Sequence, residues 1–316
     1  MRSPLLTVPA LMAGILLLTA CGSERTGSRS DASPHESPCG AQPSGTATAS
    51  DGVRITGASR GAGGCAAEFE VTNHEAEPFT YTITFTFLSG AGEALASQKE
   101  TVPSVGPGRT VKRTVTMSGT GALPSGTRAP ARVQIAGVRS VPTAEAPTPG
   151  GSCPPSGVRV YADDGDAAMG LRVAGIHLEN CGTATTRLDG YPQLQVLDKA
   201  RKPVDGVEVL QGGSSIATGT GADGVPRPLA LAPGERAYAT LVWRNTVEGG
   251  APVNAPYVRV RATPGAAPVT VTPELDLGTT GKLGVGPWKK DETSAPGTGG
   301  STSSGTRSPE RPPARP

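Results

Sequence analysis

The sequence predicts an all-β fold of two tandem antiparallel β-sandwiches, and three observations support this prediction. Apolar and polar residues alternate along many short segments, which is the period of a half-buried strand. The chain contains 44 glycines and 31 prolines, and many of them separate these segments and mark turns. No segment shows a convincing helical period. Many short strands separated by turns are typical of antiparallel sandwiches.

The first predicted sandwich comprises residues 39–140. Its clearest strand carries apolar residues at every second position, with threonines between them. The apolar set is Phe79, Tyr81, Ile83, Phe85 and Phe87, and the threonines are Thr80, Thr82, Thr84 and Thr86. One face of this strand is therefore expected in the core. Further along the chain, Arg113 shares a face with Val111 and Val115, so we interpret it as an edge position or a β-bulge.

The second predicted sandwich comprises residues 153–288 and repeats the same style of short alternating segments. Between Leu171 and Leu178 the parity of the apolar positions changes at Gly175, which predicts a β-bulge at this glycine. We interpret Gly206–Gly224 as a long irregular segment, because glycine recurs throughout it.

Two short patterns occur once in each predicted sandwich. Phe69–Asn73 resembles Ile176–Asn180, and Val105–Arg109 resembles Leu231–Glu235, with Pro-Gly in the middle of each later segment. Such an internal repeat indicates that the two blocks share one architecture.

Residues 1–20 are predicted to be a lipoprotein signal peptide. Arg2 precedes an apolar run that is too short to cross a membrane, which takes roughly 20 apolar residues. The run ends at Leu18-Thr19-Ala20-Cys21, which resembles the lipobox of bacterial lipoproteins. This resemblance implies that the Cys21 sulfur carries a diacylglycerol with acyl chains such as palmitate. The protein would then be lipid-anchored at the extracytoplasmic face of the cell membrane.

Three other segments are polar, rich in Ser, Gly and Pro, and without an apolar period. They are a tether at residues 21–38, a linker at 141–152 and a tail at 289–316. The tether and the tail are predicted to be disordered, because such segments bury too little apolar surface to offset their ordering entropy.

Four cysteines follow Cys21, which in an oxidising compartment favours disulfides. Three pairings are open from sequence alone, and the spacing favours Cys39 with Cys65 and Cys153 with Cys181. A zinc site is the alternative, but no pair has C-x-x-C spacing and no histidine is adjacent to a cysteine. We therefore expect no metal and no cofactor.

The formal net charge is +2, from 29 basic and 27 acidic residues. So small a charge gives no strong field to attract nucleic acid, and nucleic-acid binding is not expected. The predicted contact with the membrane is the N-terminal lipid.

The sequence contains few candidates for catalytic residues. The three histidines are His35, His74 and His177, and we expect His177 on the outer face of a strand. No nucleophile elbow, P-loop or H-E-x-x-H motif is present. The acidic run at residues 163–166 departs from the EF-hand pattern, so we interpret it as a turn rather than a calcium site.

Three aromatic residues of the second block are informative. Trp243 shares a strand face with Ala239 and Leu241, so we expect it in the core. Trp288 stands before two lysines, so we expect it to be exposed. Tyr191 precedes a proline, in a constrained turn or a cis peptide bond, and either offers a platform for a ligand or packs beneath the loop. Tyr191 and Trp288 are the candidate ligand contacts.

The second block contains four motifs that occur together: Asn180-Cys181, Gly190-Tyr191-Pro192, Leu231-Ala232-Pro233-Gly234 and the segment from Ala237 to Trp243. As a set they resemble a family of actinobacterial secreted and lipid-anchored domains known as domain of unknown function 4232. The first block resembles generic immunoglobulin-like domains of bacterial envelope proteins. These resemblances imply two immunoglobulin-like sandwiches at the cell envelope, and neither implies a substrate or a catalytic residue.

The sequence therefore favours a non-catalytic binding or scaffolding module of the envelope, with a protein or a glycan as its partner. Its recognition surface is expected on the second domain, because loops on a rigid sandwich usually carry recognition. The alternative is an envelope enzyme with an unrecognised site of Asp, Glu and Tyr residues. A deep pocket with shifted carboxylates would favour that alternative.

Overall fold

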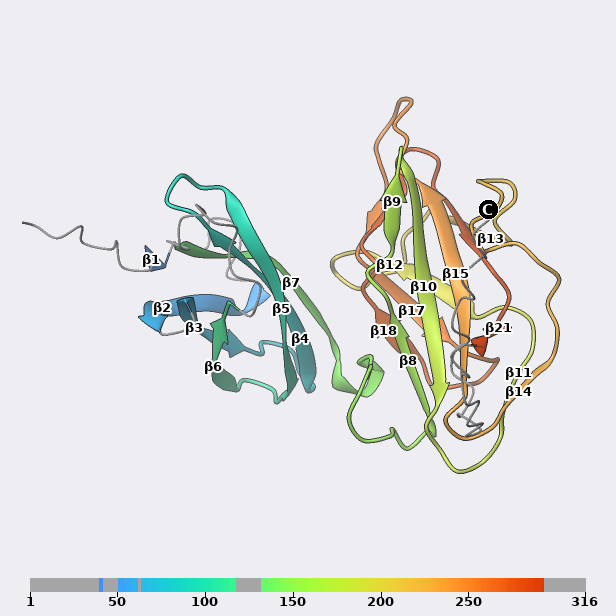
Figure 1. Ribbon diagram of the computed structural model, residues 1–316, viewed down its shortest axis with the longest axis horizontal. Coiled ribbons are helices and arrows are strands. Elements are labelled where there is room, and N and C mark those ends of the chain that lie inside the picture. Colours follow the sequence, from blue (N-terminus) through green and yellow to red (C-terminus); the bar gives the residue numbers. More distant parts are fainter. Residues whose placement is uncertain (1–39, 42–50, 62–63, 118–131, 293–316) are drawn as a thin grey trace, which may run out of the picture. The chain divides into compact units, whose positions relative to one another are not determined.

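The computed structural model describes residues 40–41, 51–61, 64–117 and 132–292 (Figure 1). This part of the chain is all-β, as predicted, with one 3₁₀ turn at Thr143–Glu145. None of its helices is long and apolar enough to cross a membrane. The predicted signal peptide, Cys21, the tether with His35, and Cys39 lie outside the described residues.

The first sandwich is built from strands β1 to β7. Their bounds are β1 Gly40–Ala41, β2 Val53–Gly61, β3 Gly64–Thr72, β4 Phe79–Leu88, β5 Ala94–Val105, β6 Thr110–Thr116 and β7 Arg132–Pro142. One sheet has the order β1-β7-β4-β5 and the other the order β2-β3-β6. All pairs are antiparallel except β1 with β7, which is parallel.

Strand β4 supplies much of the first core. Phe85 and Phe87 are fully buried, and Phe69 of β3 meets Phe85 with ring centroids 4.9 Å apart. Thr82 and Thr84 lie on the opposite, half-exposed face. The predicted alternation is therefore confirmed, because a strand with period two places one residue type on each side.

Strand β6 is an edge strand, since β3 is its one partner among the described strands. Arg113 is exposed on it and donates from Nη1 to the Lys112 carbonyl at 2.9 Å. Of the two interpretations of Arg113, the edge position is correct. A charged side chain on an edge also discourages pairing with another chain.

The second sandwich is built from strands β8 to β21. Their bounds are β8 Val158–Ala162, β9 Asp166–Ala168, β10 Leu171–Asn180, β11 Thr186–Leu188, β12 Gln193–Leu197, β13 Glu208–Gln211, β14 Leu229–Leu231, β15 Arg236–Arg244, β16 Asn254–Ala255, β17 Tyr257–Arg261, β18 Val269–Val271, β19 Leu275–Asp276, β20 Lys282–Val285 and β21 Lys289–Lys290. The main sheet has the order β13-β20-β15-β10-β8, with β9 and β21 attached to it. Strands β12-β17-β18 form a second sheet, and β11-β14 and β16-β19 form two-stranded pairs. The pair β13-β20 is parallel, so the prediction of antiparallel sheets holds for all described pairs except this one and β1-β7.

The second core is aliphatic around one tryptophan. Ile176 and Leu178 of β10 and Leu241 of β15 are fully buried within it. Trp243 is 3% exposed and donates its indole N–H to Asp276 Oδ1 at 2.7 Å. The prediction that Trp243 belongs to the core is confirmed.

Strand β10 has no bulge at Gly175, so that prediction was wrong. Its register with β15 runs unbroken from Leu171 to Glu179, and its buried positions alternate from Ala174 to Asn180. The glycine serves a contact instead. A Cβ at Gly175 would lie 2.4 Å from Asp163 Oδ2 and 2.7 Å from His177 Nε2, so any larger residue would displace the ends of these two side chains.

Trp288 is buried, which corrects the prediction that it is exposed. It is 2% exposed, and its indole N–H donates to the Ala262 carbonyl at 2.9 Å. The cause is β21, which pairs with β15 directly after it. Lys289 donates from Nζ to the Gly221 and Asp223 carbonyls, both at 2.7 Å. The first residues of the predicted tail therefore belong to the fold, and residues 293–316 lie outside the described chain.

Two other predicted loop segments contain more structure than expected. Within Gly206–Gly224, residues Glu208–Gln211 form β13 beside β20. The flanking glycines concealed it, because a strand this short is defined by its partner and not by its own pattern. In the predicted linker, Glu145 accepts from Arg259 Nε at 2.8 Å and from Thr270 Oγ1 at 2.6 Å. The linker is therefore held against β17 and β18.

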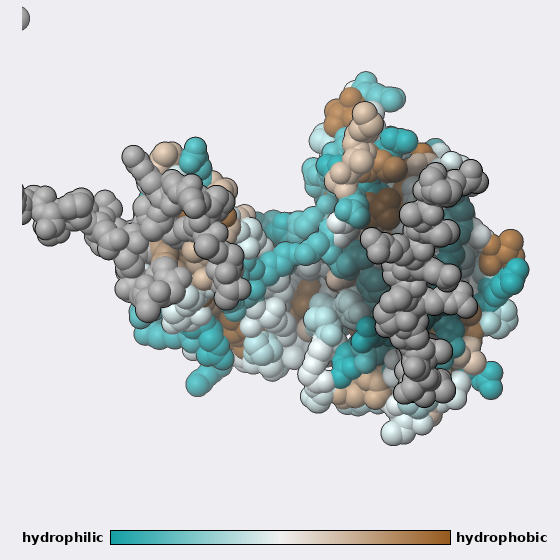
Figure 2. All heavy atoms as spheres, viewed as in Figure 1, coloured by the Kyte–Doolittle hydropathy of each residue, from teal (hydrophilic) through white to brown (hydrophobic). Residues whose placement is uncertain are grey.

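Exposed apolar residues are few in the described chain. The large ones are Met169, Val209, Val225 and Val247. On the face shown in Figure 2, hydrophobic residues form small separate patches among hydrophilic ones. Scattered residues of this kind are normal on a soluble domain and do not by themselves indicate a binding surface.

Candidate ligand-binding cleft

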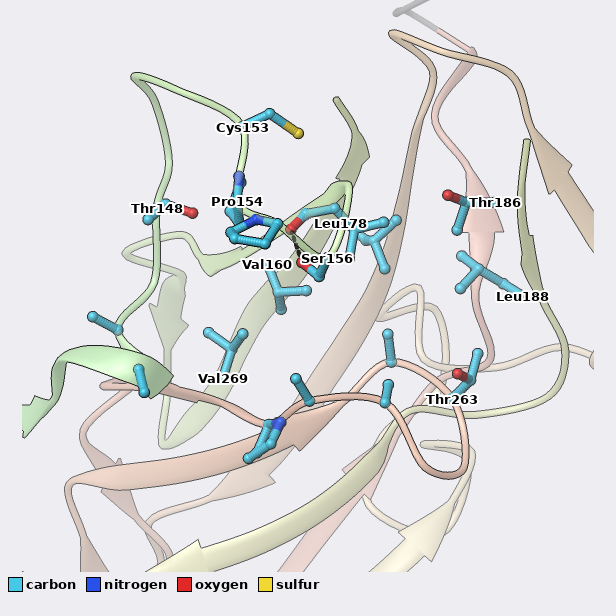
Figure 3. A pocket seen from close by; sticks show the side chains of 18 of the residues that line it. Thr148, Cys153, Pro154, Ser156, Val160, Leu178, Thr186, Leu188, Thr263 and Val269 are labelled. Carbon is cyan, nitrogen blue, oxygen red and sulfur yellow. Dashed lines mark hydrogen bonds between the residues drawn. The ribbon is translucent and has the colours of Figure 1, made fainter. Parts of the chain in front are cut away.

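A cleft of about 620 Å³ opens at one edge of the second sandwich (Figure 3). One wall comes from β8 and β10, and the other from β11, β18 and the turn before β18. The segment from Thr143 to Ser156 lines it as well. Strands β8 and β18 are edge strands of their two sheets. The cleft lies between them, where no other described strand closes the sandwich.

The floor of the cleft is the hydrophobic core itself. Leu178 is fully buried, Leu188 is 2% exposed and Val160 is 4% exposed, yet all three line the cleft. Figure 3 shows Val160, Val269 and Leu188 projecting into it from different strands. The cleft therefore lies directly over the aliphatic core.

The remaining lining is mostly hydroxyl-bearing or small. Hydroxyls are supplied by Thr148, Ser152, Ser156, Thr186 and Thr263, among others. Arg187 is the one charged residue of the lining within the described chain, and no carboxylate, imidazole or aromatic ring lines the cleft there. The Arg187 guanidinium has no hydrogen-bond or ion-pair partner among the described residues. This arrangement can bind by apolar contact and by hydrogen bonding.

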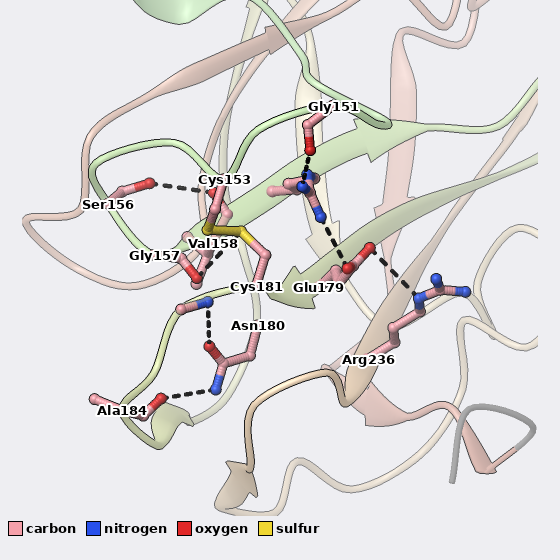
Figure 4. Close-up of a disulfide and its surroundings, with 12 residues drawn as sticks. Gly151, Cys153, Ser156, Gly157, Val158, Glu179, Asn180, Cys181, Ala184 and Arg236 are labelled. Carbon is pink, nitrogen blue, oxygen red and sulfur yellow. Dashed lines mark hydrogen bonds and ion pairs between the residues drawn. A yellow bond between two sulfur atoms is a disulfide. The ribbon is translucent and has the colours of Figure 1, made fainter. Parts of the chain in front are cut away.

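A disulfide joins the segment that lines the cleft to the end of β10 (Figure 4). It links Cys153, which is part of the lining, to Cys181, across a sequence separation of 28. The predicted pairing of these two cysteines is confirmed. Cys65 is also disulfide-bonded, and its partner is not in the second domain, since Cys153 and Cys181 are taken. The pairing of Cys65 with Cys39 stays a prediction, because Cys39 lies outside the described residues.

Charged side chains reinforce the same region. Arg159 donates from Nη1 to Glu179 Oε1 at 2.9 Å, and Arg236 Nε lies 3.6 Å from Glu179 Oε2. Arg159 also donates from Nη2 to the Gly151 carbonyl. Arg159 and Glu179 are only 12% and 17% exposed, so their pairing is shielded from solvent. These bonds join Gly151 to β8 and β10, and they therefore hold the segment that leads to Cys153 in place.

Asn180 holds the end of β10 from the other side. It is 1% exposed, and its Nδ2 donates to the carbonyls of Ala184 and Leu231, both at 2.8 Å. Gly182 N donates to Asn180 Oδ1 at 3.2 Å. With the disulfide, these bonds hold the end of β10 beside the cleft.

The two predicted ligand contacts lie elsewhere. Tyr191 is half-buried, and its ring packs against the second core. The described chain has no cis peptide bond, so Tyr191 does not precede a cis proline. Trp288 is buried, and neither residue lines the cleft. Sequence reasoning missed Val160, Leu178 and Leu188, because a core residue beside a cleft has the same sequence pattern as any other core residue.

His177 lies on the outer face of β10, as expected. Its Nε2 lies 3.0 Å from Asp163 Oδ2, and its ring stacks on Tyr161 with centroids 5.2 Å apart. Asp163 Oδ1 accepts from Gly165 N at 3.0 Å and from Gly175 N at 2.8 Å. The acidic run is thus a turn, as predicted. The described residues contain no cluster of three or more His, Cys, Asp or Glu side chains suited to a metal ion.

Two carboxyl groups have lowered pKa values, and both lie outside the cleft. The hydrogen bond from Arg54, followed by that from Lys112, lowers the pKa of Glu70. The hydrogen bond from Lys290, followed by that from the Ala232 amide, lowers the pKa of Glu235. These are the shifts of carboxylates held in ion pairs.

Comparison with known proteins finds a family model that matches the second domain. No curated protein matches the chain. A crystal structure of red sea bream transglutaminase aligns with 74% of this chain and 30% of its own, at 10% identity and a TM-score of 0.17. The chain thus spans less than a third of that protein, and so low a score supports no inference. Residues 153–289, which include the cleft strands and the disulfide, match the family model described as Domain of unknown function (DUF4232), in agreement with the resemblance predicted for the second block.

Proposed function

We propose that the protein is a lipid-anchored, extracytoplasmic binding module of the cell envelope, and that its second domain binds a ligand without chemical turnover. The observation that carries this proposal is the cleft. Its volume of about 620 Å³ lies in the range of roughly 300 to 1,000 Å³ that small-molecule sites occupy.

The lining supports binding rather than catalysis. General acid or base catalysis needs a titratable group within hydrogen-bond reach of the reacting atoms, with a pKa near the working pH. In the described part of the chain, the cleft presents aliphatic side chains, hydroxyls and one guanidinium. The pKa values of Glu70 and Glu235 are lowered, and both carboxylates are paired with cations outside the cleft.

The location is supported by two independent features. Leu18-Thr19-Ala20-Cys21 resembles a lipobox, so Cys21 would carry the membrane anchor. The Cys153–Cys181 bond is of the kind that persists in oxidising compartments and is rare in the cytosol. In this proposal the first, immunoglobulin-like domain is a spacer or scaffold between the anchor and the second domain.

The proposal is tested on protein purified from the membranes of cells that make it. Ala267 lies exposed in the mouth of the cleft, so Ala267→Trp fills the mouth without disturbing the core. Ala251→Trp adds the same ring at an exposed position outside the cleft. Native mass spectrometry should find a co-purified small molecule on the wild type and on Ala251→Trp, and none on Ala267→Trp. Cys21→Ala should abolish membrane fractionation.

Two results would overturn the proposal. One is turnover of an envelope substrate by the purified protein, abolished by replacing a single carboxylate. The other is a ligand load that is the same in wild type and in Ala267→Trp.

A further inference from the structure

We propose that the Cys153–Cys181 disulfide is a redox-sensitive latch on the wall of the cleft, and that a dithiol protein opens it by reduction. The part that concerns the ligand rests on the proposed function, since it names a regulation of the same cleft. Three observations carry the proposal: the exposure of Cys153, the few other bonds that hold its segment, and the place of that segment in the lining.

The disulfide is accessible from solvent at one end. Cys153 is exposed, whereas Cys181 is half-buried. Figure 4 shows the bond joining the segment before β8 to the end of β10. Exchange begins when a thiolate reaches one of the two sulfur atoms, and exposed disulfides are the more labile ones. Cys153 can therefore be attacked while the domain stays folded, with Cys181 as the leaving group.

Apart from the disulfide, little holds residues 147–156, which we call the wall segment. It contains no helix or strand, and none of its residues is buried. Four of them are prolines, which donate no backbone hydrogen bond. Two described hydrogen bonds join it to β8: Arg159 donates from Nη2 to the Gly151 carbonyl, and Ser156 Oγ donates to the Val158 carbonyl at 3.1 Å. The disulfide is thus its one covalent attachment to the rest of the sandwich apart from the chain itself.

The wall segment forms one side of the cleft. Figure 3 shows Thr148, Cys153 and Pro154 along this side, across from Thr186 and Leu188. The aliphatic residues beneath the cleft are 0 to 4% exposed with the disulfide intact. Reduction therefore frees the wall segment and gives a looser cleft, because a segment with few buried contacts and few hydrogen bonds opens easily.

The reaction is thiol–disulfide exchange with a protein that carries two neighbouring thiols. One thiolate of that protein attacks Cys153 Sγ, the disulfide breaks, and Cys181 leaves as a thiolate that takes up a proton. The second thiolate of the partner then attacks the mixed disulfide and releases Cys153 as a thiol. The partner loses two electrons and ends as a disulfide, and the second domain gains two electrons and two protons.

The experiment uses the full-length chain with Cys21→Ala, which removes the predicted lipid, and dithiothreitol as the reductant. Alkylation and peptide mass spectrometry measure the reduction rate of Cys153 and Cys181, in buffer and in concentrated urea. NMR order parameters of Thr148, Gly150 and Ser152 report the motion of the wall segment, with those of β15 as the internal control. Thermal unfolding shows whether the reduced protein is folded.

We expect the native rate of reduction to lie within about tenfold of the rate in urea, because Cys153 is reached without unfolding. The order parameters of the wall segment should fall from about 0.85 to below about 0.6 on reduction, while those of β15 stay near 0.85. Reduction that requires unfolding would overturn the proposal. So would a wall segment that is equally ordered, or equally mobile, in the two redox states.

The double variant Cys153→Ser with Cys181→Ser is the matched control. It should show the low order parameters without any reductant and should not respond to dithiothreitol. A response that persists in this variant would come from the disulfide of Cys65 and would contradict the latch. The measurements on the wild type do not depend on the folding of this variant.

Failure of the latch and failure of the proposed function give different results. Native mass spectrometry should find a severalfold smaller load of co-purified ligand on the reduced protein. If Ala267→Trp removes the ligand but reduction does not change its load, the cleft is a binding site and the latch does not regulate it. If Ala267→Trp leaves the load unchanged, the proposed function is wrong, and the order parameters still decide whether the disulfide holds the wall segment.

Discussion

Asn73 and Asn180 occupy the same position in their two domains and make the same hydrogen bonds. Each is buried, and each donates two hydrogen bonds from Nδ2. One goes to the carbonyl four residues ahead, and the other goes to the carbonyl of the first residue of the later Pro-Gly segment. These acceptors are Glu77 and Val105 for Asn73, and Ala184 and Leu231 for Asn180. The backbone repeats the pattern, since the Asn73 carbonyl accepts from Gly108 N at 2.9 Å and the Asn180 carbonyl from Gly234 N at 2.7 Å.

The short repeated patterns in the sequence therefore mark one structural motif that occurs in both domains. An asparagine ends a strand, and a Pro-Gly turn folds back over it so that its amide is fully satisfied. A buried amide requires such partners, because an unpaired one would cost about 1 to 3 kcal/mol. This shared motif explains why the two short patterns are similar in sequence although most of the two domains is not.

Asn180→Ala is expected to destabilise the second domain by about 2 to 4 kcal/mol, because it leaves the Ala184 and Leu231 carbonyls without a donor. Urea unfolding measures this loss. Asn254 is exposed, so Asn254→Ala is the matched control and should change the free energy of unfolding by less than about 0.5 kcal/mol. Equal effects of the two changes would show that the amide of Asn180 is not a structural requirement.

Gly175→Ala is expected to separate His177 from Asp163, because the new Cβ would lie 2.4 Å from the Asp163 carboxylate. The expected cost is about 1 kcal/mol, the order of the side-chain pair that it breaks, because both contacted atoms are the ends of partly exposed side chains that can move. Gly137 is the control, since a Cβ there meets nothing within 4 Å. Differential scanning calorimetry of both variants decides the matter, and a melting temperature unchanged by Gly175→Ala would contradict the contact.

Trp288→Ala is expected to cost about 3 to 5 kcal/mol, the usual loss for removing a large buried aromatic residue. Trp288→Phe keeps most of the packing but leaves the Ala262 carbonyl without its donor, so its cost should be smaller. Deleting residues 293–316 tests whether the stability comes from Trp288 and β21 or from the residues after them. This deletion should leave the melting temperature of the folded part unchanged. Loss of stability on that deletion alone would show that the tail contributes to the fold.

Glu235 gives the second domain a pH dependence of predictable sign. Its pKa is lowered by the hydrogen bond from Lys290, so the native state favours the carboxylate. The stability from this pair is fully present above the ordinary Glu pKa of about 4.3 and is lost as pH falls through the lowered, folded-state value.

Urea unfolding of wild type and Glu235→Gln checks this dependence. The wild type should be the more stable of the two at pH 7, and the difference should shrink as the pH falls below 4. A difference that is constant from pH 7 to pH 3 would mean that the carboxylate itself contributes nothing.

The strands with a clear apolar period were predictable, and those defined by their partners were not. Strand β4 alternates so regularly that its register and buried face follow from period two alone. Strand β13 and the burial of Trp288 depend on β20 and β15, which are distant in sequence, so no local pattern reveals them. Gly175 misled the prediction for a related reason: glycine is used at a bulge and at a close contact alike, and only the position of Asp163 distinguishes the two.

The candidate site was less predictable than the fold. The spacing of Cys153 and Cys181 indicated their pairing, but nothing in the sequence indicated that Cys153 lines a cleft. Val160 and Leu178 alternate like any core residues, and the cleft exists because no strand covers the gap between β8 and β18. An uncovered gap is a property of how the sheets end, and sequence periodicity carries no information about it.

The central claim is that the second domain binds its ligand in this cleft, and methyl NMR tests it most directly. Full-length Cys21→Ala protein with labelled methyl groups is titrated with the small molecule that co-purifies with the wild type. The account predicts saturable shifts of Val160, Leu178, Leu188 and Val269, whose side chains line the cleft, with no change at Val53 in the first domain. Shifts confined to the exposed Met169 and Val247, or no saturable shift at the four cleft methyl groups, would contradict it.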